Sequence, residues 1–332
     1  MPDFGCIVFR LSQARYRSLF EGIWGKQSFD IDWPGNTARV CRTPAGAFGN
    51  DPTPLHLSPK DRGTAFATFN AYADSISAFE QGPEVSPFSS KFDAFLAGKA
   101  TLTADEMAGY TLFRGKGNCN SCHLDGRSTT LPGTDTGQPA DVQPLFTDTT
   151  SANLGLPKPF PYDPIYYQNK PDFFGLTPNP AGASFMDLGV GLFLRSQSGV
   201  NPNSHWTQFA PDFDGFMQVA TARDVGLRPA SPNFVKNYMH NGYLKSLKEV
   251  VHFYNTRDRA DYAHPAAIGQ CPPGFVEKVN CWPMPEVPQT KDMTIGDLGL
   301  TDQEENQIVA FLETLTDGYT TPFPNANTYT GP

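Results

Sequence analysis

The sequence predicts a mainly α-helical fold in which short helices are joined by long, ordered loops rich in Pro and Gly. Several segments carry apolar residues at helical spacing, and two of them begin with capping boxes. The 332 residues also include 31 Pro and 30 Gly, which interrupt helices. With 26 Phe residues the chain can bury a sizeable core. A domain typically takes about 100–200 residues, so we expect two compact units.

Three helical patterns occur in the first hundred residues. The first runs from Phe9 to Trp24, and residues 30–60 then form an irregular connection. The second begins at Ser58, a good N-cap followed by Pro59. A shorter helix is predicted from Ser89 to Leu96. The first two patterns each predict an apolar core face, formed by Leu11, Ala14, Leu19 and Phe20 in one and by Phe66, Phe69, Ala73, Ile76 and Phe79 in the other.

Capping boxes open two further helices. Thr103 to Glu106 begins a helix over 104–114, in which Gly109 permits close contact with another helix. The second box, Thr301 to Glu304, opens a last helix that Gly318 ends. Its apolar stripe is formed by Ile308, Phe311, Leu312 and Leu315. Between 126 and 232 only Ser184 to Leu194 is expected to be regular. We place the domain boundary near residues 98–103, which gives domains 1–100 and 101–332.

The segment Cys119-Asn120-Ser121-Cys122-His123 follows directly after the helix over 104–114. Two thiols at this spacing reach the two vinyl groups of one haem, and the adjacent imidazole reaches the iron, so the pattern indicates one covalent c-type haem. The second domain is therefore predicted to be cytochrome c-like. A redox dithiol or half of a zinc site are the alternatives, although no second Cys pair with zinc spacing follows.

The net charge and the expected cellular location limit the classes of partner molecule that the chain could bind. A formal net charge of −9 argues against nucleic acid and favours a neutral or basic protein partner. No run of about 18 apolar residues is present, so no membrane span is expected. Haem attachment to such a motif indicates a periplasmic, extracellular or cell-surface location, yet the first 25 residues lack a signal peptide, so we expect the natural N-terminus to lie upstream. In that setting a disulfide between Cys271 and Cys281 is predicted, whereas a second one between Cys6 and Cys41 is left open.

The second axial ligand is not fixed by composition. Methionine would favour electron transfer and tyrosinate would stabilise ferric iron, so the choice decides function. The downstream candidates are Met186, Met217, Met239, Met284, Met293, His205, His240, His252, His264 and Tyr254.

Several segments resemble the bacterial dihaem cytochrome c peroxidase and MauG family. The most specific is Tyr238-Met239-His240-Asn241-Gly242, followed by Ser246 to Val251 and by Phe253-Tyr254-Asn255. The others are Ala14 to Phe20 with Trp24-Gly25, Ser90 to Gly98, Gly109 to Lys116, Phe146 to Asp148, and Asn153 to Pro157. These segments span both predicted domains.

The resemblance implies a set of haem contacts. In the family the distal ligand of the C-terminal haem lies fourteen residues after the His of the Tyr-x-His-x-Gly segment, and here that position is Tyr254. His123 and Tyr254 are therefore implied as axial ligands, with Met239 and Met217 as rivals and a buried aromatic as the alternative role of Tyr254. His240 is implied in the haem surroundings, or alternatively as a core histidine. Arg223 is a candidate partner of a haem propionate, or of a surface ion pair.

The chain departs from the family in two ways. The family's N-terminal Cys-x-x-Cys-His, which carries the peroxidatic haem, has no counterpart here. We therefore expect a fragment of a longer dihaem protein, in which residues 1–100 are the remainder of a peroxidase-type domain. The alternatives are that this haem is lost or is carried by a second haem-bearing chain. The family's interdomain calcium is also uncertain, because its carbonyl donors would fall on Val235 and Asn237 and its side-chain donor has no counterpart.

The function implied is that of a haem c oxidoreductase, a cytochrome c peroxidase or MauG-type enzyme that relays electrons or oxidising equivalents for hydrogen peroxide reduction or for oxidation of a protein substrate. Its electron donor would be a small c-type cytochrome or copper protein. The alternatives are a monohaem electron-transfer cytochrome without catalysis of its own, and a structural or assembly subunit whose haem connects it electrically to its neighbours. The catalytic residues are not assigned by the sequence.

Overall fold

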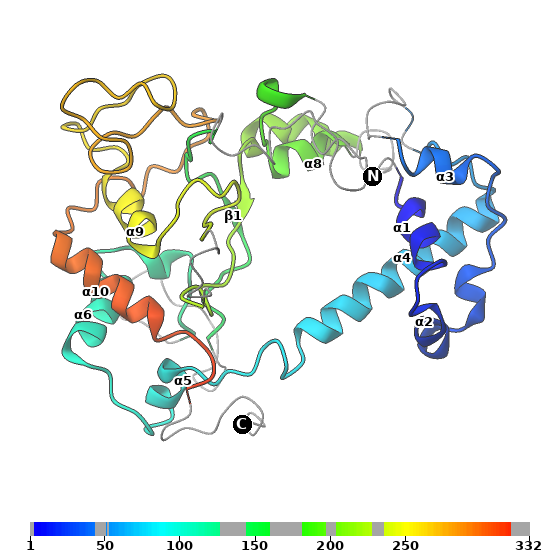
Figure 1. The fold of residues 1–332 in the computed structure, drawn as a ribbon, viewed down its shortest axis with the longest axis horizontal. Coiled ribbons are helices and arrows are strands. Elements are labelled where there is room, and N and C mark those ends of the chain that lie inside the picture. The colour runs from blue at the N-terminus through cyan, green and yellow to red at the C-terminus, as the bar shows by residue number, and fades with distance from the viewer. Residues whose placement is uncertain are drawn as a thin grey trace. The chain divides into compact units, whose positions relative to one another are not determined.

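The computed structural model describes residues 3–43, 51, 53–126, 144–159, 181–196, 204–227 and 236–319. The chain divides into two compact units. Unit 1 comprises Met1–Ser86, Pro164–Phe185 and Leu194–Gln208, and unit 2 comprises Pro87–Asp163, Met186–Phe193 and Phe209–Pro332. Helices dominate the described residues (Figure 1), and the strands named there, β1 (Ser151–Ala152) and β2 (Met217–Gln218), form one antiparallel pair with Ser151 opposite Gln218. The predicted mainly α fold class is confirmed, whereas the functional assignment of the predicted domains stays a prediction.

Unit 1 is built from helices α1 (Gly5–Leu11), α2 (Arg17–Trp24), η1 (Lys26–Phe29), α3 (Thr37–Val40) and α4 (Pro59–Glu80). Helix α4 begins as predicted, with the Ser58 side chain accepting a hydrogen bond from the Asp61 backbone N–H. Helix α1 packs against α4, and a disulfide joins Cys6 to Cys41. The core of the unit contains Val8, Leu11, Phe20, Phe29, Ile31, Ala65 and Ala71.

Two predictions for unit 1 are wrong. The helix predicted over residues 9–24 is two helices, because the chain turns after Leu11, where the Ser12 hydroxyl donates to the Phe9 carbonyl. Leu19 is consequently 71% exposed. Most of the long apolar face of α4 is not core either, and of its members only Phe69 packs against the core of the unit. The helix buries its small side, with Ala65, Thr68 and Ala71, and the Thr68 hydroxyl donates to the Ser28 carbonyl. The exposed members of the predicted face are Phe66, Ala73, Ile76 and Phe79.

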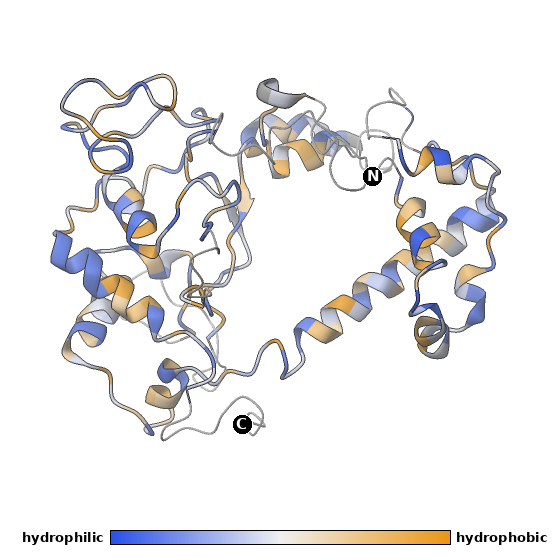
Figure 2. Cartoon of the chain, viewed as in Figure 1, coloured by the Kyte–Doolittle hydropathy of each residue, from blue (hydrophilic) through white to orange (hydrophobic). Residues whose placement is uncertain are grey.

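Unit 2 centres on the packing of α6 (Ala104–Arg114) against α10 (Asp302–Glu313). Both capping boxes are present as predicted, at Thr103 and Thr301. Gly109 is the contact point, because a Cβ there would lie 1.9 Å from the Gln307 carbonyl oxygen. Figure 2 shows α10 with a hydrophilic first turn followed by hydrophobic residues, and its Phe311 ring packs 5.0 Å from that of Tyr110.

The remaining elements of unit 2 are short. Helix α5 (Lys91–Leu96) starts at a capping box on Ser90, and η2 (Cys119–Ser121) lies in the Cys-x-x-Cys-His segment. Helix α9 (Leu247–Thr256) begins at the N-cap Ser246. Near the predicted regular segment 184–194 the structure has η3 (Gly182–Ser184) and α8 (Val190–Ser196); α8 and η5 (Ser204–Phe213) contain residues of both units. No helix that the structure describes has the length and apolar character needed to cross a bilayer.

Two further predictions concern the C-terminal part of unit 2. Helix α10 ends at Glu313 rather than at Gly318, because the Thr314 hydroxyl turns back to the Phe311 carbonyl and the helical hydrogen bonds stop there. Gly318, with φ +91°, instead lets the following chain turn away. The predicted disulfide between Cys271 and Cys281 is present, with an S–S distance of 2.03 Å.

Candidate functional site

A cavity of about 740 Å³ lies within unit 2. Its volume is typical of a site for a cofactor or other small ligand. Residues from α6, η2, α9 and α10 line it, together with parts of the loops 152–156, 215–225, 237–240 and 292–300. The apolar side chains of its wall include Phe113, Leu156, Val225, Leu247, Val250, Val251, Leu298, Leu300, Ile308 and Leu312. The cavity therefore favours a largely apolar ligand.

Cys119 and Cys122 both line this cavity, and both are free thiols. The other four cysteines form disulfides, whereas these two thiols are not bonded to each other. Asn118, in the left-handed conformation with φ 53°, reverses the chain after α6 and brings the two thiols to the cavity wall. Burial raises the pKa of the Cys119 thiol to about 12, which keeps it protonated at neutral pH.

A buried polar cluster attaches the motif to helix α6. The side-chain oxygen of Asn120 accepts a hydrogen bond from the Asp125 backbone N–H at 2.9 Å. The Asp125 carboxylate accepts from the Tyr110 hydroxyl at 2.6 Å and pairs with Arg114 at 3.2 Å. Because Asp125 is fully buried, these partners compensate the cost of its desolvation. Tyr110, Arg114 and Asp125 all lie close to the motif in the chain, but no sequence pattern predicts that they form this cluster.

His123 presents one nitrogen to a fixed partner. Its Nδ1 lies 2.9 Å from the Phe146 carbonyl oxygen, and because a carbonyl only accepts, Nδ1 carries the proton. Nε2 is then the nitrogen with a lone pair for a metal, as is usual for ligating histidines. Burial lowers the pKa of His123, against the opposing effects of Phe146, Asp148 and Ala220. A neutral imidazole is the form that binds iron.

Tyr254 comes to the same cavity from α9. Burial raises the pKa of its phenol, and the nearby Cys119 and Cys122 raise it further, whereas Arg257 lowers it. The phenol is thus neutral unless a cation lies beside it, since a bound metal ion reverses such a shift. The structure therefore brings Tyr254 and the motif together around one space.

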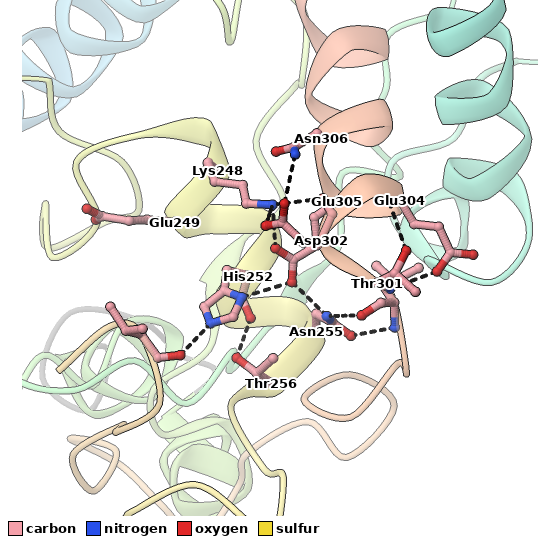
Figure 3. A network of polar contacts seen from close by, with 12 residues as sticks. Lys248, Glu249, His252, Asn255, Thr256, Thr301, Asp302, Glu304, Glu305 and Asn306 are labelled. Carbon is pink, nitrogen blue, oxygen red and sulfur yellow. Dashed lines mark hydrogen bonds and ion pairs between the residues drawn. The ribbon is translucent and has the colours of Figure 1, made fainter. Parts of the chain in front are cut away.

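A polar network between α9 and α10 fixes the helix that carries Tyr254 (Figure 3). His252 Nδ1 lies 2.8 Å from the Glu305 carboxylate, which also accepts from Asn255 at 2.7 Å and from Lys248 at 2.8 Å. The Asn255 side chain additionally bonds both backbone groups of Leu300. His252 and Asn255 lie on either side of Tyr254 in the sequence, so the network restricts rotation of the helix at that residue.

The other distal candidates separate into two groups. Met217, Met239 and His240 line the cavity with Tyr254. The remaining candidates do not line it. Met186, Met284 and Met293 are exposed, His252 belongs to the α9–α10 network, and His264 Nε2 lies 3.0 Å from the Arg259 carbonyl oxygen. His205 is exposed as well. The iron ligand itself stays a prediction, now among fewer side chains.

Arg223 lines the cavity, but its guanidinium is engaged elsewhere. It bonds the Asp93 carboxylate at 2.7 Å and the Asp317 carboxylate at 3.0 Å, and only 7% of the side chain is exposed. The ion pair is thus buried rather than at the surface. A contact with a haem propionate stays a prediction.

Of the two predicted calcium donors, Val235 lies outside the described residues. Asn237 is described, and its side-chain oxygen accepts a hydrogen bond from the Lys245 ammonium group at 2.5 Å. Lys245 also donates to the Gly242 carbonyl at 2.6 Å. In the described ranges no three His, Cys, Asp or Glu side chains are grouped so that they could hold a metal ion. Calcium at this place stays a prediction, and the zinc alternative for the Cys pair finds no ligand set in this part of the chain.

Relatives were found by sequence and by structure. MauG, the methylamine utilization protein of Paracoccus denitrificans, is 27% identical over 322 residues, which cover 96% of this chain and 61% of that protein. The cytochrome-c peroxidase IdrP1 of Denitromonas iodatirespirans is 27% identical over 74% of this chain and 49% of its own length. The chain is thus similar, over most of its length, to proteins named MauG and cytochrome-c peroxidase. No family model matches the sequence.

The fold agrees with this similarity. The crystal structure of the dihaem peroxidase BthA from Burkholderia thailandensis matches with a TM-score of 0.53 at 20% identity, over 95% of this chain and 59% of that one. The chain thus spans about three fifths of the length of MauG and of BthA. The resemblance noted in the sequence is therefore found again in the curated relatives, and the predicted fold is confirmed.

Proposed function

We propose that this chain is a haem c oxidoreductase that relays electrons for the reduction of hydrogen peroxide or the oxidation of a protein substrate. The observation that carries the proposal is one apolar cavity that receives two free thiols, a neutral imidazole and a phenol. This donor set suits a covalently attached haem, and the cavity volume of about 740 Å³ suits a ligand of that kind. The similarity to MauG and to a cytochrome-c peroxidase supports the reaction class.

Each residue has a defined part in the proposal. Cys119 and Cys122 would form the two thioether bonds to the haem, and His123 Nε2 and Tyr254 Oη would be the donors to its iron. The bound haem supplies one-electron redox chemistry. The Phe146 carbonyl holds the proton on His123 Nδ1 and thereby keeps Nε2 directed to the cavity. The apolar walls exclude water, and His240 and Arg223 complete the surroundings of the cofactor.

The location and partners form part of the same proposal. Two disulfides in the described residues favour a periplasmic or extracellular setting. The electron donor would be a small c-type cytochrome or copper protein, and a second haem would lie in another part of the protein or in another chain. A monohaem electron-transfer cytochrome is the second candidate, because the sequence holds one Cys-x-x-Cys-His.

Substitution of Tyr254 tests the proposed ligand set. A pyridine haemochrome assay should give one haem per chain, and Tyr254→Phe should retain that haem while changing the ferric absorption and EPR spectra. The midpoint potential should rise, because an anionic oxygen ligand stabilises ferric iron.

The matched control for this experiment is Tyr262→Phe. Tyr262 lies close to α9, 3.4 Å from His252, but does not line the cavity, so its loss should leave the spectra unchanged. Identical spectra for Tyr254→Phe and the parent would remove Tyr254 from the iron. A methionine-ligated spectrum without peroxide reactivity would instead favour the electron-transfer cytochrome.

A further inference from the structure

Arg257 is the first residue after helix α9, and its guanidinium is buried. It donates to three backbone carbonyls: Nη1 to Leu154 at 2.5 Å, and Nη2 to Asp292 at 2.5 Å and to Ile295 at 2.9 Å. Nε and Nη2 also bond the Asp258 carboxylate, at 3.1 and 2.5 Å. The planar group thus joins the end of α9 to two separate loops.

Both loops are walls of the cavity. Leu154 belongs to one, and Asp292 and Ile295 belong to the other, and all three line the cavity together with Tyr254. The second loop also returns to the helix, because the Gly296 backbone N–H donates to the Tyr254 carbonyl at 2.7 Å. Arg257 therefore connects the residue proposed as iron ligand to the walls between which the cofactor would lie.

Two glycines in the left-handed region lie beside this arrangement. Gly296 has φ +110°, and a Cβ there would lie 2.4 Å from an Asp258 carboxylate oxygen. Gly155, beside Leu154, has φ +68°, and a Cβ there would lie 2.6 Å from the side chain of Lys291. The Lys291 ammonium group in turn binds Asp258 at 2.6 Å. Glycines at these two places permit the close approach of both loops to the Arg257–Asp258 pair.

We propose that Arg257 is a positioning residue for Tyr254, which it holds together with the two loops in the arrangement that would let the phenol bind a haem iron. The inference rests on the proposed ligation by Tyr254. Arginine is required at this place because its rigid fork reaches three carbonyls and a carboxylate at once, whereas a lysine ammonium is a single point donor.

The test compares Arg257→Gln and Arg257→Lys in the haem-loaded protein. Hydrogen bonds from a charged group are worth roughly tenfold each in an equilibrium constant, so the fraction of ferric haem that lacks the tyrosine ligand should rise about tenfold or more in both variants. EPR and ferric absorption spectra measure this fraction, and thermal unfolding is recorded on the same samples. Arg259→Lys is the matched control, since Arg259 pairs only with Asp261 near the surface among the carboxylates described.

The outcomes separate this inference from the proposed function. If Tyr254→Phe changes the spectra and the Arg257 variants fold with parental spectra but lower stability, Arg257 is only structural and the inference is wrong. If Tyr254→Phe leaves the spectra unchanged, the proposed ligation itself fails. Should the Arg257 variants not fold, Asp258→Asn weakens the same cluster while the guanidinium remains, and parental spectra in that variant would overturn the inference.

Discussion

At the scale of single residues, unit 2 contains one buried arginine held by two carboxylates. Arg223 lies between Asp93, at the start of α5, and Asp317, beyond the end of α10. One oxygen of Asp317 is buried and has no hydrogen-bond partner among the described residues. Burial accordingly raises the pKa of Asp317 to about 6, although Arg223 opposes the shift. Because two carboxylates share one buried cation, the cost of burying the charge of Asp317 is poorly compensated.

This imbalance gives a pH-dependent stability. The folded-state pKa of Asp317, about 6, lies above the ordinary value of about 3.9, so the unfolded chain releases this proton first as the pH rises. The protonated Asp317 carboxyl therefore contributes to stability below pH ~4, and this contribution is lost as the pH rises through ~6. As the pH rises between these two values, the unfolding free energy of Asp317→Asn should increase by about 1–3 kcal/mol relative to that of the parent, measured by urea titration at each pH.

The control for Asp317→Asn is an exposed carboxylate with the opposite shift. A hydrogen bond from Lys248 lowers the pKa of Asp302, so Asp302→Asn should lose stability relative to the parent as the pH rises, and by a smaller amount. A difference between Asp317→Asn and the parent that does not vary with pH would show that Asp317 titrates normally in the folded protein.

At the scale of elements, the contact between α6 and α10 depends on a missing side chain. Gly109 brings the α6 backbone against the Gln307 carbonyl of α10, and the Tyr110 and Phe113 rings pack on Phe311 beside it. Both helices contribute residues to the cavity wall. The closeness of this pair therefore also sets the width of the candidate haem site.

Gly109→Ala tests this contact. The added Cβ would lie 1.9 Å from a backbone oxygen, which must move, so we expect a loss of about 1–3 kcal/mol in unfolding free energy and a perturbed haem spectrum. Gly63→Ala is the matched control in α4, where nothing lies within 4 Å of the new methyl group. That variant should gain about 0.5–1 kcal/mol, because alanine is the better helix former. Equal effects of the two substitutions would refute the packing role of Gly109.

These helices also show what the sequence can predict. Ser58, Thr103 and Thr301 were found as N-caps because capping is local, and Gly109 because a lone glycine on an apolar helical face has few other roles. The prediction of a core face on α4 was largely wrong because periodicity shows which side of a helix is apolar, not whether another element covers that side. Arg257 was missed for a related reason, since its carbonyl partners lie up to 103 residues away and carry no sequence signal.

At the scale of the whole molecule, each unit carries its own disulfide, and that of unit 2 joins Cys271 to Cys281. The Cys6–Cys41 disulfide closes a loop of 35 residues within unit 1. Cys119 and Cys122 belong to unit 2, and several core residues of this unit line the cavity. In the part of unit 2 that the structure describes, the helices other than α6, α9 and α10 are short, so we expect the unit to gain much of its core from the bound haem, by the linkage between ligand binding and stability.

Removing the thiol pair that lines the cavity and removing the disulfide of unit 1 should therefore affect different units. Cys119→Ala with Cys122→Ala should abolish covalent haem and destabilise unit 2, which hydrogen exchange would report in α6, α9 and α10. Cys6→Ser with Cys41→Ser should keep the haem and its spectra, because every residue lining the cavity belongs to unit 2, while α1 and α4 lose about 2–4 kcal/mol of protection. Loss of the haem spectrum in the second variant, or unchanged exchange of α6, α9 and α10 in the first, would show that the cavity is not the centre of unit 2 as argued.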